Sequence, residues 1–145
     1  MEVVMLRFFT AVFFAFFIIT TAYAEDVNAN DKQAFQQVIS GQLDAFKSQN
    51  GPLAYSFAAP LVTKIFPTVD NFMAMVKQGY APVYENDSYR FGELAIDRIG
   101  RPAQHVTLTT KDGRHYEAVY AMQKQADGTW KISGCTLVEI PGLDV

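Results

Sequence analysis

The chain has 145 residues and a formal net charge of −3 at pH 7, from 12 lysines and arginines against 15 aspartates and glutamates. The basic residues form no cluster, which excludes an electrostatic surface for nucleic acid or anionic lipid. The length suits one domain with a core of its own. The single cysteine, Cys135, excludes an intrachain disulfide.

The beginning of the chain has the pattern of a secretory signal peptide. One basic residue, Arg7, precedes an apolar run over residues 8–19, and residues 22–24 (Ala-Tyr-Ala) match a small-x-small cleavage site. The segment is also at the short limit for a helix that spans a bilayer, so an uncleaved anchor is the alternative. We expect residues 1–24 to be removed. The mature protein is then periplasmic or secreted, with no stable membrane anchor.

Residues 25–30 are polar and are predicted to be a disordered linker, so that one folded domain covers residues 31–145. A first helix is predicted over residues 31–49, with Asn30 or Asp31 as its N-cap. Apolar residues recur there at steps of three and four and share one face. They are Phe35, Val38, Ile39, Leu43 and Phe46.

Further helices are predicted between the prolines and glycines that follow. Pro52 suits the first turn of a short helix over residues 53–58, and residues 61–66 form one or two more turns after the next proline. Thr68 is the predicted cap of a further helix over residues 69–79. The sequence therefore predicts that three main helices precede any strand.

After these helices the apolar period changes to the alternation that is typical of strands. Residues 80–85 are predicted to be a short extended segment, which a proline confines to a sheet edge, and residues 86–88 a turn. A strand is predicted over residues 89–99. The break in its alternation at Gly92 and Glu93 indicates a β-bulge.

The length of the turns sets the register of the last two hairpins. Three-residue loops at 111–113 and 126–128, each ending in a left-handed glycine, place one consistent apolar set on a single face, whereas a two-residue turn mixes the faces. The inward set is Val106, Leu108, Tyr116, Tyr120, Met122, Trp130 and Ile132. A small apolar cluster on the outward face is the predicted homodimer interface. It consists of Val119, Ala121, Cys135 and Leu137.

Two passages resemble an exported bacterial family, the domain of unknown function 4864. They are residues 72–84, Phe-Met-Ala-Met-Val-Lys-Gln-Gly-Tyr-Ala-Pro-Val-Tyr, and residues 120–135, Tyr-Ala-Met-Gln-Lys-Gln-Ala-Asp-Gly-Thr-Trp-Lys-Ile-Ser-Gly-Cys. Helices followed by a curved sheet also resemble the cystatin-like cone fold of nuclear transport factor two, the steroid isomerases and the SnoaL-like cyclases. The resemblance implies an α+β fold in which three N-terminal helices pack on the concave face of a curved, mainly antiparallel sheet. It implies no catalytic residues.

Aromatic and polar side chains on the predicted concave face are the candidate ligand-binding residues. They are Tyr55, Tyr80, Tyr84, Gln104, Tyr116, Tyr120, Met122 and Trp130. A buried polar group without a partner costs about 1–3 kcal/mol. These groups therefore either satisfy one another in a core or direct a ligand within a small apolar pocket. We expect a non-enzymatic module that binds a small apolar ligand or a partner without a cofactor.

An isomerase- or cyclase-like enzyme is the alternative function. Such an enzyme needs an acid or base inside the concave face, and the inward positions hold no aspartate, glutamate or histidine. Alternation leaves the direction of Glu93 open, so this alternative relies on Glu93 or a tyrosine. His105 and His115 lie far apart along adjacent predicted strands without a further ligand nearby, so no metal site is expected.

Overall fold

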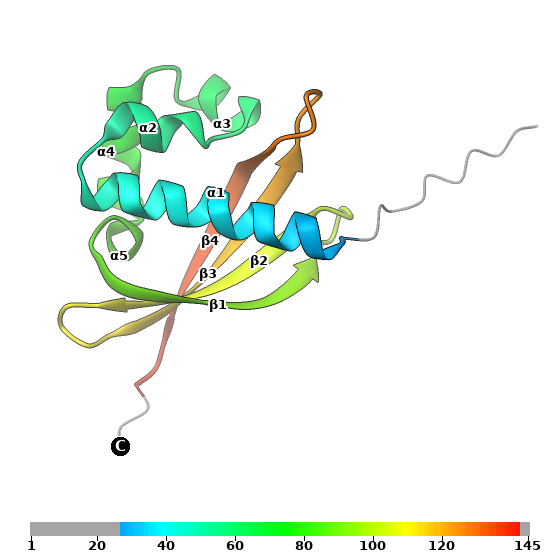
Figure 1. Cartoon of the computed structure of the whole chain (residues 1–145). Helices are drawn as coiled ribbons and strands as arrows, with labels where there is room; N and C mark the ends of the chain where they lie inside the picture. Colours follow the sequence, from blue (N-terminus) through cyan, green and yellow to red (C-terminus); the bar gives the residue numbers. More distant parts are fainter. Residues whose placement is uncertain (1–26, 143–145) are drawn as a thin grey trace, which may run out of the picture.

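The structure is a computed structural model, and it describes residues 27–142. Five helices come first: α1 (Ala29–Lys47), α2 (Gly51–Ser56), α3 (Pro60–Ile65), α4 (Val69–Gly79) and α5 (Ala81–Tyr84). Four strands follow: β1 (Asn86–Ile96), β2 (Pro102–Thr110), β3 (His115–Lys124) and β4 (Trp130–Ile140). They form an open antiparallel sheet in the order β1-β2-β3-β4 (Figure 1). The fold is therefore α+β, with the helices preceding the sheet.

Helix α1 begins earlier than the sequence pattern predicted. Asn28 is its N-cap, because the Asn28 Oδ1 accepts a hydrogen bond from the backbone N–H of Asp31 at 3.0 Å. In return, Asp31 Oδ2 accepts from the backbone N–H of Asn28 at 3.2 Å, which completes a capping box. The predicted cap at Asn30 or Asp31 is wrong. Residues 29–30, which were expected in the linker, belong to the helix.

The expected signal peptide over residues 1–24 lies outside the described residues, as do residues 25–26 of the expected linker. Cleavage after Ala24 therefore stays a prediction from the sequence. In the part of the chain that the structure describes, no helix has the length and hydropathy needed to cross a membrane.

The helices after α1 follow the predicted order, but the total within residues 27–142 is five rather than three. The turns predicted over residues 61–66 form helix α3, and α5 was not predicted. Thr68 caps α4 as predicted, since its Oγ1 accepts from the backbone N–H of Asn71 at 3.1 Å. Helix α5 replaces the extended segment predicted over residues 80–85. Pro82 lies in the first turn of this helix, where a missing N–H costs nothing. The predicted turn at residues 86–88 is also wrong, since these residues open β1.

All three hairpins between the four strands use the same three-residue loop. The backbone N–H of Thr110 donates to the carbonyl of Arg114 at 3.0 Å, and that of Gln125 donates to Thr129 at 2.7 Å. Both predicted loop lengths are therefore confirmed. Each loop ends in a glycine with positive φ: Gly100 at 81°, Gly113 at 82° and Gly128 at 84°. Glycine is required at these positions because a Cβ atom disfavours this backbone conformation.

The predicted bulge in β1 is also confirmed. Phe91 lies opposite Val106 and Leu94 lies opposite Gln104, so β1 has one residue more than β2 over this stretch. The extra residue returns Leu94 to the face of Phe91, and both side chains pack against the core.

A second bulge, in β4, was not predicted. Met122 lies opposite Ile132, as the three-residue loop requires, but Tyr120 lies opposite Cys135. Ser133 is therefore an extra residue in β4. A register shift of one residue turns every later side chain to the other face of the sheet.

This bulge corrects the predicted outer face. Cys135 and Leu137 lie on the side of the helices, where they pack against the core. Gly134 lies opposite Ala121 on the outer face. The predicted cluster is therefore divided, with Val119 and Ala121 on the outside and the other two members on the inside.

The helices cover one face of the sheet. In Figure 1, α1 runs across the strands, with α2, α3 and α4 grouped above it. The core between the two layers contains the predicted inward residues Val106, Leu108, Tyr116, Tyr120, Met122 and Ile132, all of them buried. Up to Ile132, the inward face is therefore the one that the loop lengths predicted.

The segment between α2 and α3 pairs with the free edge of β4. The backbone N–H of Ile132 donates to the carbonyl of Phe57 at 2.9 Å, and the N–H of Ala59 donates to the carbonyl of Ile132 at 2.8 Å. Beyond the β4 bulge, the Tyr80 hydroxyl donates to the carbonyl of Cys135 at 2.9 Å. Hydrogen bonds from the helical half of the chain therefore flank the bulge, with one set before Ser133 and one after it.

Candidate functional site

A pocket of about 350 Å³ lies between the helices and strands β3 and β4. We call it the helix–sheet pocket. Its apolar lining includes Phe46, Val62, Phe72, Met75, Val76, Val83 and Ile132. Its polar lining consists of Gln42, Tyr80, Tyr120, Ser133 and Cys135. The residues that line it include no aspartate, glutamate, histidine, lysine or arginine, so the pocket is uncharged.

Tyr120, which lines this pocket, has a buried hydroxyl. It lies in the middle of β3, and its side chain is 1% exposed. The hydroxyl oxygen has no hydrogen-bond partner among the described residues. Burial raises the pKa of Tyr120 well above its ordinary value of 10.0, and the nearby Cys135 adds to the shift. The hydroxyl therefore stays protonated at neutral pH and can both donate and accept a hydrogen bond.

The β4 bulge forms the neighbouring wall of the pocket. Ser133 is 8% exposed, and its hydroxyl donates to the carbonyl oxygen of Ala121 at 3.2 Å. Cys135 follows on the same face as Tyr120, and its carbonyl oxygen accepts the hydrogen bond from Tyr80. The bulge therefore brings together side chains that strict alternation would assign to opposite faces.

Neither Cys135 nor Tyr80 is ionised near neutral pH. Burial raises the pKa of the Cys135 thiol to about 12, although the residue as a whole is only half-buried because it borders the pocket. Burial also raises the pKa of Tyr80, with a smaller contribution from Cys135. Because the thiolate and not the thiol is the nucleophile, Cys135 is unsuited to covalent catalysis.

Gln42 is a pocket residue that the sequence reasoning missed. It lies on α1, is 5% exposed, and its Nε2 donates to the carbonyl oxygen of Ala54 at 3.1 Å. Its position, three residues after Ile39 and four before Phe46, places it on the buried face of the helix. Helical spacing could have identified it, but the predicted stripe was restricted to apolar residues.

Of the candidate ligand-binding residues, Tyr80 and Tyr120 line the helix–sheet pocket. Tyr55 instead joins α2 to the C-cap of α3, because its hydroxyl donates at 2.6 Å to the carbonyl oxygen of that cap residue. Tyr84 and Tyr116 line a separate and larger cavity. The structure therefore distributes the predicted tyrosines over three environments.

The other predicted members have contacts within the fold. They are Gln104 and Met122 in the core and Trp130 beside α1. Gln104 is fully buried, and its Nε2 donates to the carbonyl oxygens of Gly92 and His105, both at 2.9 Å, so that it supports the β1 bulge. Trp130 packs edge-on against Phe35, with ring centroids 4.6 Å apart. These side chains hold the sheet and α1 in place outside the lining of the helix–sheet pocket.

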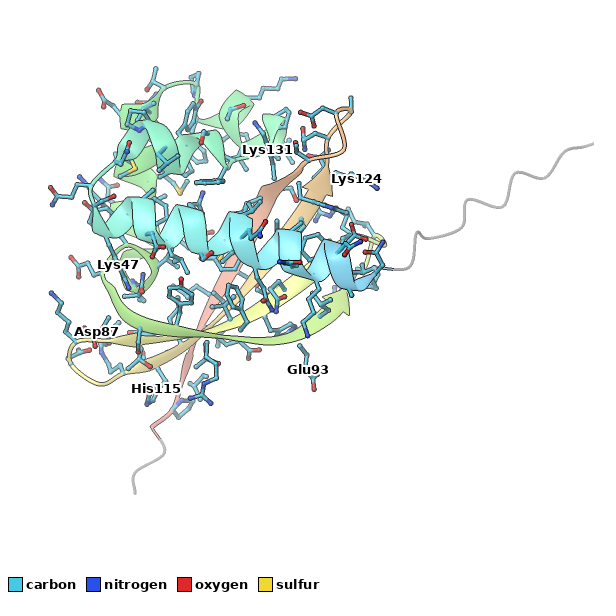
Figure 2. All side chains as sticks on the ribbon, viewed as in Figure 1. Lys47, Asp87, Glu93, His115, Lys124 and Lys131 are labelled. Atoms are coloured by element: carbon cyan, nitrogen blue, oxygen red, sulfur yellow. The ribbon has the colours of Figure 1, made fainter. Side chains whose placement is uncertain are left out.

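Glu93, the acid considered for the enzymatic alternative, lies outside the pocket. It is exposed at the β1 bulge and points away from the helices (Figure 2). An exposed carboxylate lacks the enclosure that tunes a group for proton transfer. On the outer face His105 contacts Glu117. No group of histidine, cysteine, aspartate and glutamate side chains within residues 27–142 could hold a metal ion.

Comparison with known proteins identifies a family for the chain. No curated protein matches the chain, and no solved structure matches it. A family model described as "Domain of unknown function (DUF4864)" matches residues 28–145. This span contains the five helices and four strands of the described residues, and with them every residue that lines the helix–sheet pocket. The chain therefore belongs to the DUF4864 family.

Proposed function

We propose that the protein is a non-enzymatic binding module that holds a small, uncharged and largely apolar molecule in the helix–sheet pocket. The observation that carries this proposal is the unpaired, buried hydroxyl of Tyr120 in a pocket with a mainly apolar lining. A buried polar group without a partner costs about 1–3 kcal/mol. A ligand that hydrogen-bonds this hydroxyl removes that cost.

The polar groups of the pocket have different roles. Gln42, Tyr80 and Ser133 each donate one hydrogen bond to a backbone carbonyl oxygen of the protein. The Cys135 thiol lies 3.7 Å from the carbonyl oxygen of the next residue. The hydroxyl of Tyr120 remains to orient a ligand, which is the arrangement typical of small-molecule sites with few polar groups.

Volume and charge restrict the class of ligand. The volume of about 350 Å³ is near the lower end of small-molecule sites, which span roughly 300–1,000 Å³. A charged ligand would lose its hydration without meeting an opposite charge in the lining. A short alkyl or ring skeleton with one carbonyl or hydroxyl group fits both limits. The lining provides no carboxylate or imidazole for proton transfer, which favours binding over an isomerase- or cyclase-like reaction.

The direct test compares 2-octanone with octane, which has the same skeleton without the carbonyl group. Purified protein is titrated with each compound, and the methyl signals of Val76 and Val83 are followed by NMR. We expect 2-octanone to shift these signals at lower concentration than octane does. Unchanged pocket methyl signals with both compounds would contradict the proposal, as would shifts confined to surface residues.

The fold proposal is that this chain is a variant of the cone fold of nuclear transport factor two. Its support is the order of elements and the coverage of one face of an antiparallel sheet by helices. The test is an experimental structure superposed on a cone-fold protein. The four strands and α1 should align, whereas a different strand order or helices on the opposite face would contradict the placement.

The localisation proposal is export to the periplasm or the medium. Its support is the apolar run over residues 8–19 followed by the Ala-Tyr-Ala site. Edman sequencing of protein purified from the periplasm or medium should begin at Glu25. A membrane-bound chain that retains residues 1–24 would favour the anchor instead.

A homodimer through the outer face of the sheet is a further proposal. The β4 bulge changes which side chains this surface contains. Val119 and Ala121 remain on it, and Val138, which lies opposite Glu117 and is 64% exposed, joins them. An exposed apolar side chain beside other apolar residues favours burial against a second copy.

A further inference from the structure

A second cavity, of about 940 Å³, lies where α1 ends near the loop between β2 and β3. We call it the hairpin cavity. Its walls are the C-terminal end of α1, helix α5, the start of β1 and the β2–β3 loop. Phe46 lines both this cavity and the helix–sheet pocket. The hairpin cavity differs from that pocket because charged side chains line it.

One wall of the hairpin cavity is the run from Glu85 to Asp87, at the junction of α5 and β1. Asn86 in the middle of this run is 4% exposed, and its Nδ2 donates to the carbonyl oxygen of Val83 at 2.8 Å. The Asn86 Oδ1 is buried and has no hydrogen-bond partner among the described residues. The wall therefore contains a hydrogen-bond acceptor that the fold leaves unsatisfied, which costs free energy unless a donor reaches it.

The two neighbours of Asn86 add negative charge to the same wall. Glu85 and Asp87 are both exposed, and their carboxylates form no ion pair within residues 27–142. Asp87 is the extra residue of a small bulge, since Asn86 lies opposite Thr110 and Ser88 opposite Thr109. Bulges re-aim side chains and are frequent beside binding sites. The wall thus offers acceptor oxygens from three successive side chains.

The opposite wall is the β2–β3 loop, and most of its charged side chains are paired with other side chains of the protein. The hydroxyl of Thr110 donates to Asp112, and Arg114 Nε donates to the same carboxylate at 2.8 Å. Arg114 also lies 4.0 Å from Glu139. Lys111 is exposed and has no ion pair among the described side chains. On this wall, Lys111 is therefore the cation without an ion-pair partner among the described side chains, and it can pair with a ligand.

The charges of the cavity are balanced. Its lining contains the cations Lys47, Lys111 and Arg114 and the anions Glu85, Asp87 and Asp112. Lys47 and Asp87 lie at the same end of the molecule in Figure 2, and Lys47 Nζ contacts the carbonyl oxygen of Asp87 at 3.5 Å. The rings of Phe46, Tyr84 and Tyr116 complete the lining. A balanced, partly aromatic cavity suits a dipolar ligand better than a polyanion or a polycation.

We propose that the hairpin cavity binds a free amino acid with an aromatic side chain. A primary ammonium group has three N–H donors, and the run Glu85-Asn86-Asp87 presents acceptor oxygens to receive them. The ligand carboxylate pairs with Lys111. The ligand ring packs against Tyr84 and Tyr116. This site is separate from the uncharged pocket of the proposed function and does not depend on it.

The test is isothermal titration calorimetry of the purified protein with three probes that share one ring: phenylalanine, phenethylamine and 3-phenylpropionate. We expect phenylalanine to bind most tightly, phenethylamine to bind more weakly and 3-phenylpropionate to bind least. Glu85→Gln and Asp87→Asn should each weaken phenylalanine binding by about tenfold, as expected for the loss of one charge-assisted hydrogen bond. Lys111→Met should weaken the binding of phenylalanine but not of phenethylamine.

Glu93→Gln is the matched control, because it removes one exposed carboxylate at the other end of β1 from Asp87 (Figure 2). It should leave phenylalanine binding unchanged. The proposal is overturned if no probe binds at millimolar concentration, or if 3-phenylpropionate binds as tightly as phenylalanine. It is also overturned if Glu93→Gln weakens binding as much as Asp87→Asn, or if 2-octanone competes with phenylalanine.

Discussion

Asp31 and Trp130, which are 99 residues apart in the chain, are joined by a hydrogen bond of 3.1 Å from the indole Nε1 to the carboxylate Oδ1. The other carboxylate oxygen accepts from the backbone N–H of Asn28. One side chain therefore caps α1 and fastens the start of this helix to the first residue of β4. Phe35, one turn further along α1, packs against the same indole ring.

Removal of this link should destabilise the fold. We expect Asp31→Ala to lower the free energy of unfolding by about 2 kcal/mol, since it removes one capping interaction and leaves the indole N–H without its partner. Urea unfolding followed by tryptophan fluorescence measures the change. Lys32→Ala, an exposed substitution in the same helical turn, is the control and should change the free energy by less than about 0.5 kcal/mol. Equal effects of the two substitutions would contradict the role of Asp31.

The unpaired hydroxyl of Tyr120 should lower the free energy of unfolding of the unliganded protein. We expect Tyr120→Phe to raise the free energy of unfolding by about 1 kcal/mol, because it removes a buried and unpaired group while keeping the ring. The same change should abolish the preference for 2-octanone over octane. Tyr116→Phe, four residues earlier on the same face, is the control, since Tyr116 does not line the helix–sheet pocket. A Tyr120→Phe protein that is less stable and keeps the preference would refute the assigned role.

Cys135 should be unreactive in the folded protein. Burial raises the pKa of its thiol from 9.0 to about 12, so the folded state retains the proton at a pH where the unfolded state loses it. The contribution to stability is therefore complete below about pH 9 and is lost as the pH rises toward about 12. At pH 8, iodoacetamide should modify the folded protein far more slowly than the urea-unfolded protein, as measured by mass spectrometry. Equal rates would show that the thiol is not buried.

The hairpin aspartates should make the protein sensitive to acid. The pKa of Asp127 lies below its ordinary value of 3.8, first because of the hydrogen bond from the Thr129 hydroxyl. The pKa of Asp112 is lowered in the same way, first by the hydroxyl of Thr110. A depressed folded-state pKa gives a contribution that is present above about pH 4 and lost as the pH falls through the folded-state value.

Asp127→Asn should therefore reduce the loss of stability on acidification below about pH 4, as measured by urea unfolding at several pH values. The control is Asp44→Asn on α1, because the Asp44 carboxylate is exposed and makes no hydrogen bond among the described residues. This control should keep the acid dependence of the unmodified protein. The same curve for both variants would contradict the assignment to the loop.

The outer face should govern self-association. We expect Val138→Asp to convert a homodimer into a monomer in sedimentation velocity, because Val138 is 64% exposed on that face. Ile99→Asp, which adds the same charge at a 73% exposed position in the β1–β2 loop, should leave the dimer intact. Leu137→Asp should lower stability instead, since Leu137 packs against the core. Sedimentation of the unmodified protein as a monomer would dispose of the dimer.

Several parts of the fold could be predicted because their causes are local. A loop of three residues that ends in glycine determines a hairpin register, as in residues 111–113 and 126–128. Thr68 caps α4 through a bond to a residue three positions away. Where two local signals competed, prediction failed, as at Pro82, which is compatible with both an edge strand and a first helical turn.

The pocket could be predicted only in part. Tyr120 was predicted because the loop lengths place it on the inward face of β3. Gln42 was missed because only apolar residues were assigned to the buried face of α1, although its helical spacing matches that face. Cys135 was assigned to the wrong face, since no local pattern marks Ser133 as an inserted residue. The hairpin cavity was not predicted because its walls come from segments that only folding brings together.

The sequence by itself determined the positions of most helices, the turn lengths and the inward face of the sheet as far as Ile132, because each depends on neighbours within a few residues. Only the tertiary structure decided which face carries Cys135 and Leu137. The edge of β4 pairs with Phe57 and Ala59 before the bulge and with the Tyr80 hydroxyl after it, and these distant partners hold the extra residue in place. Since side chains alternate with a period of two, one inserted residue was enough to move the pocket wall from one side of the sheet to the other.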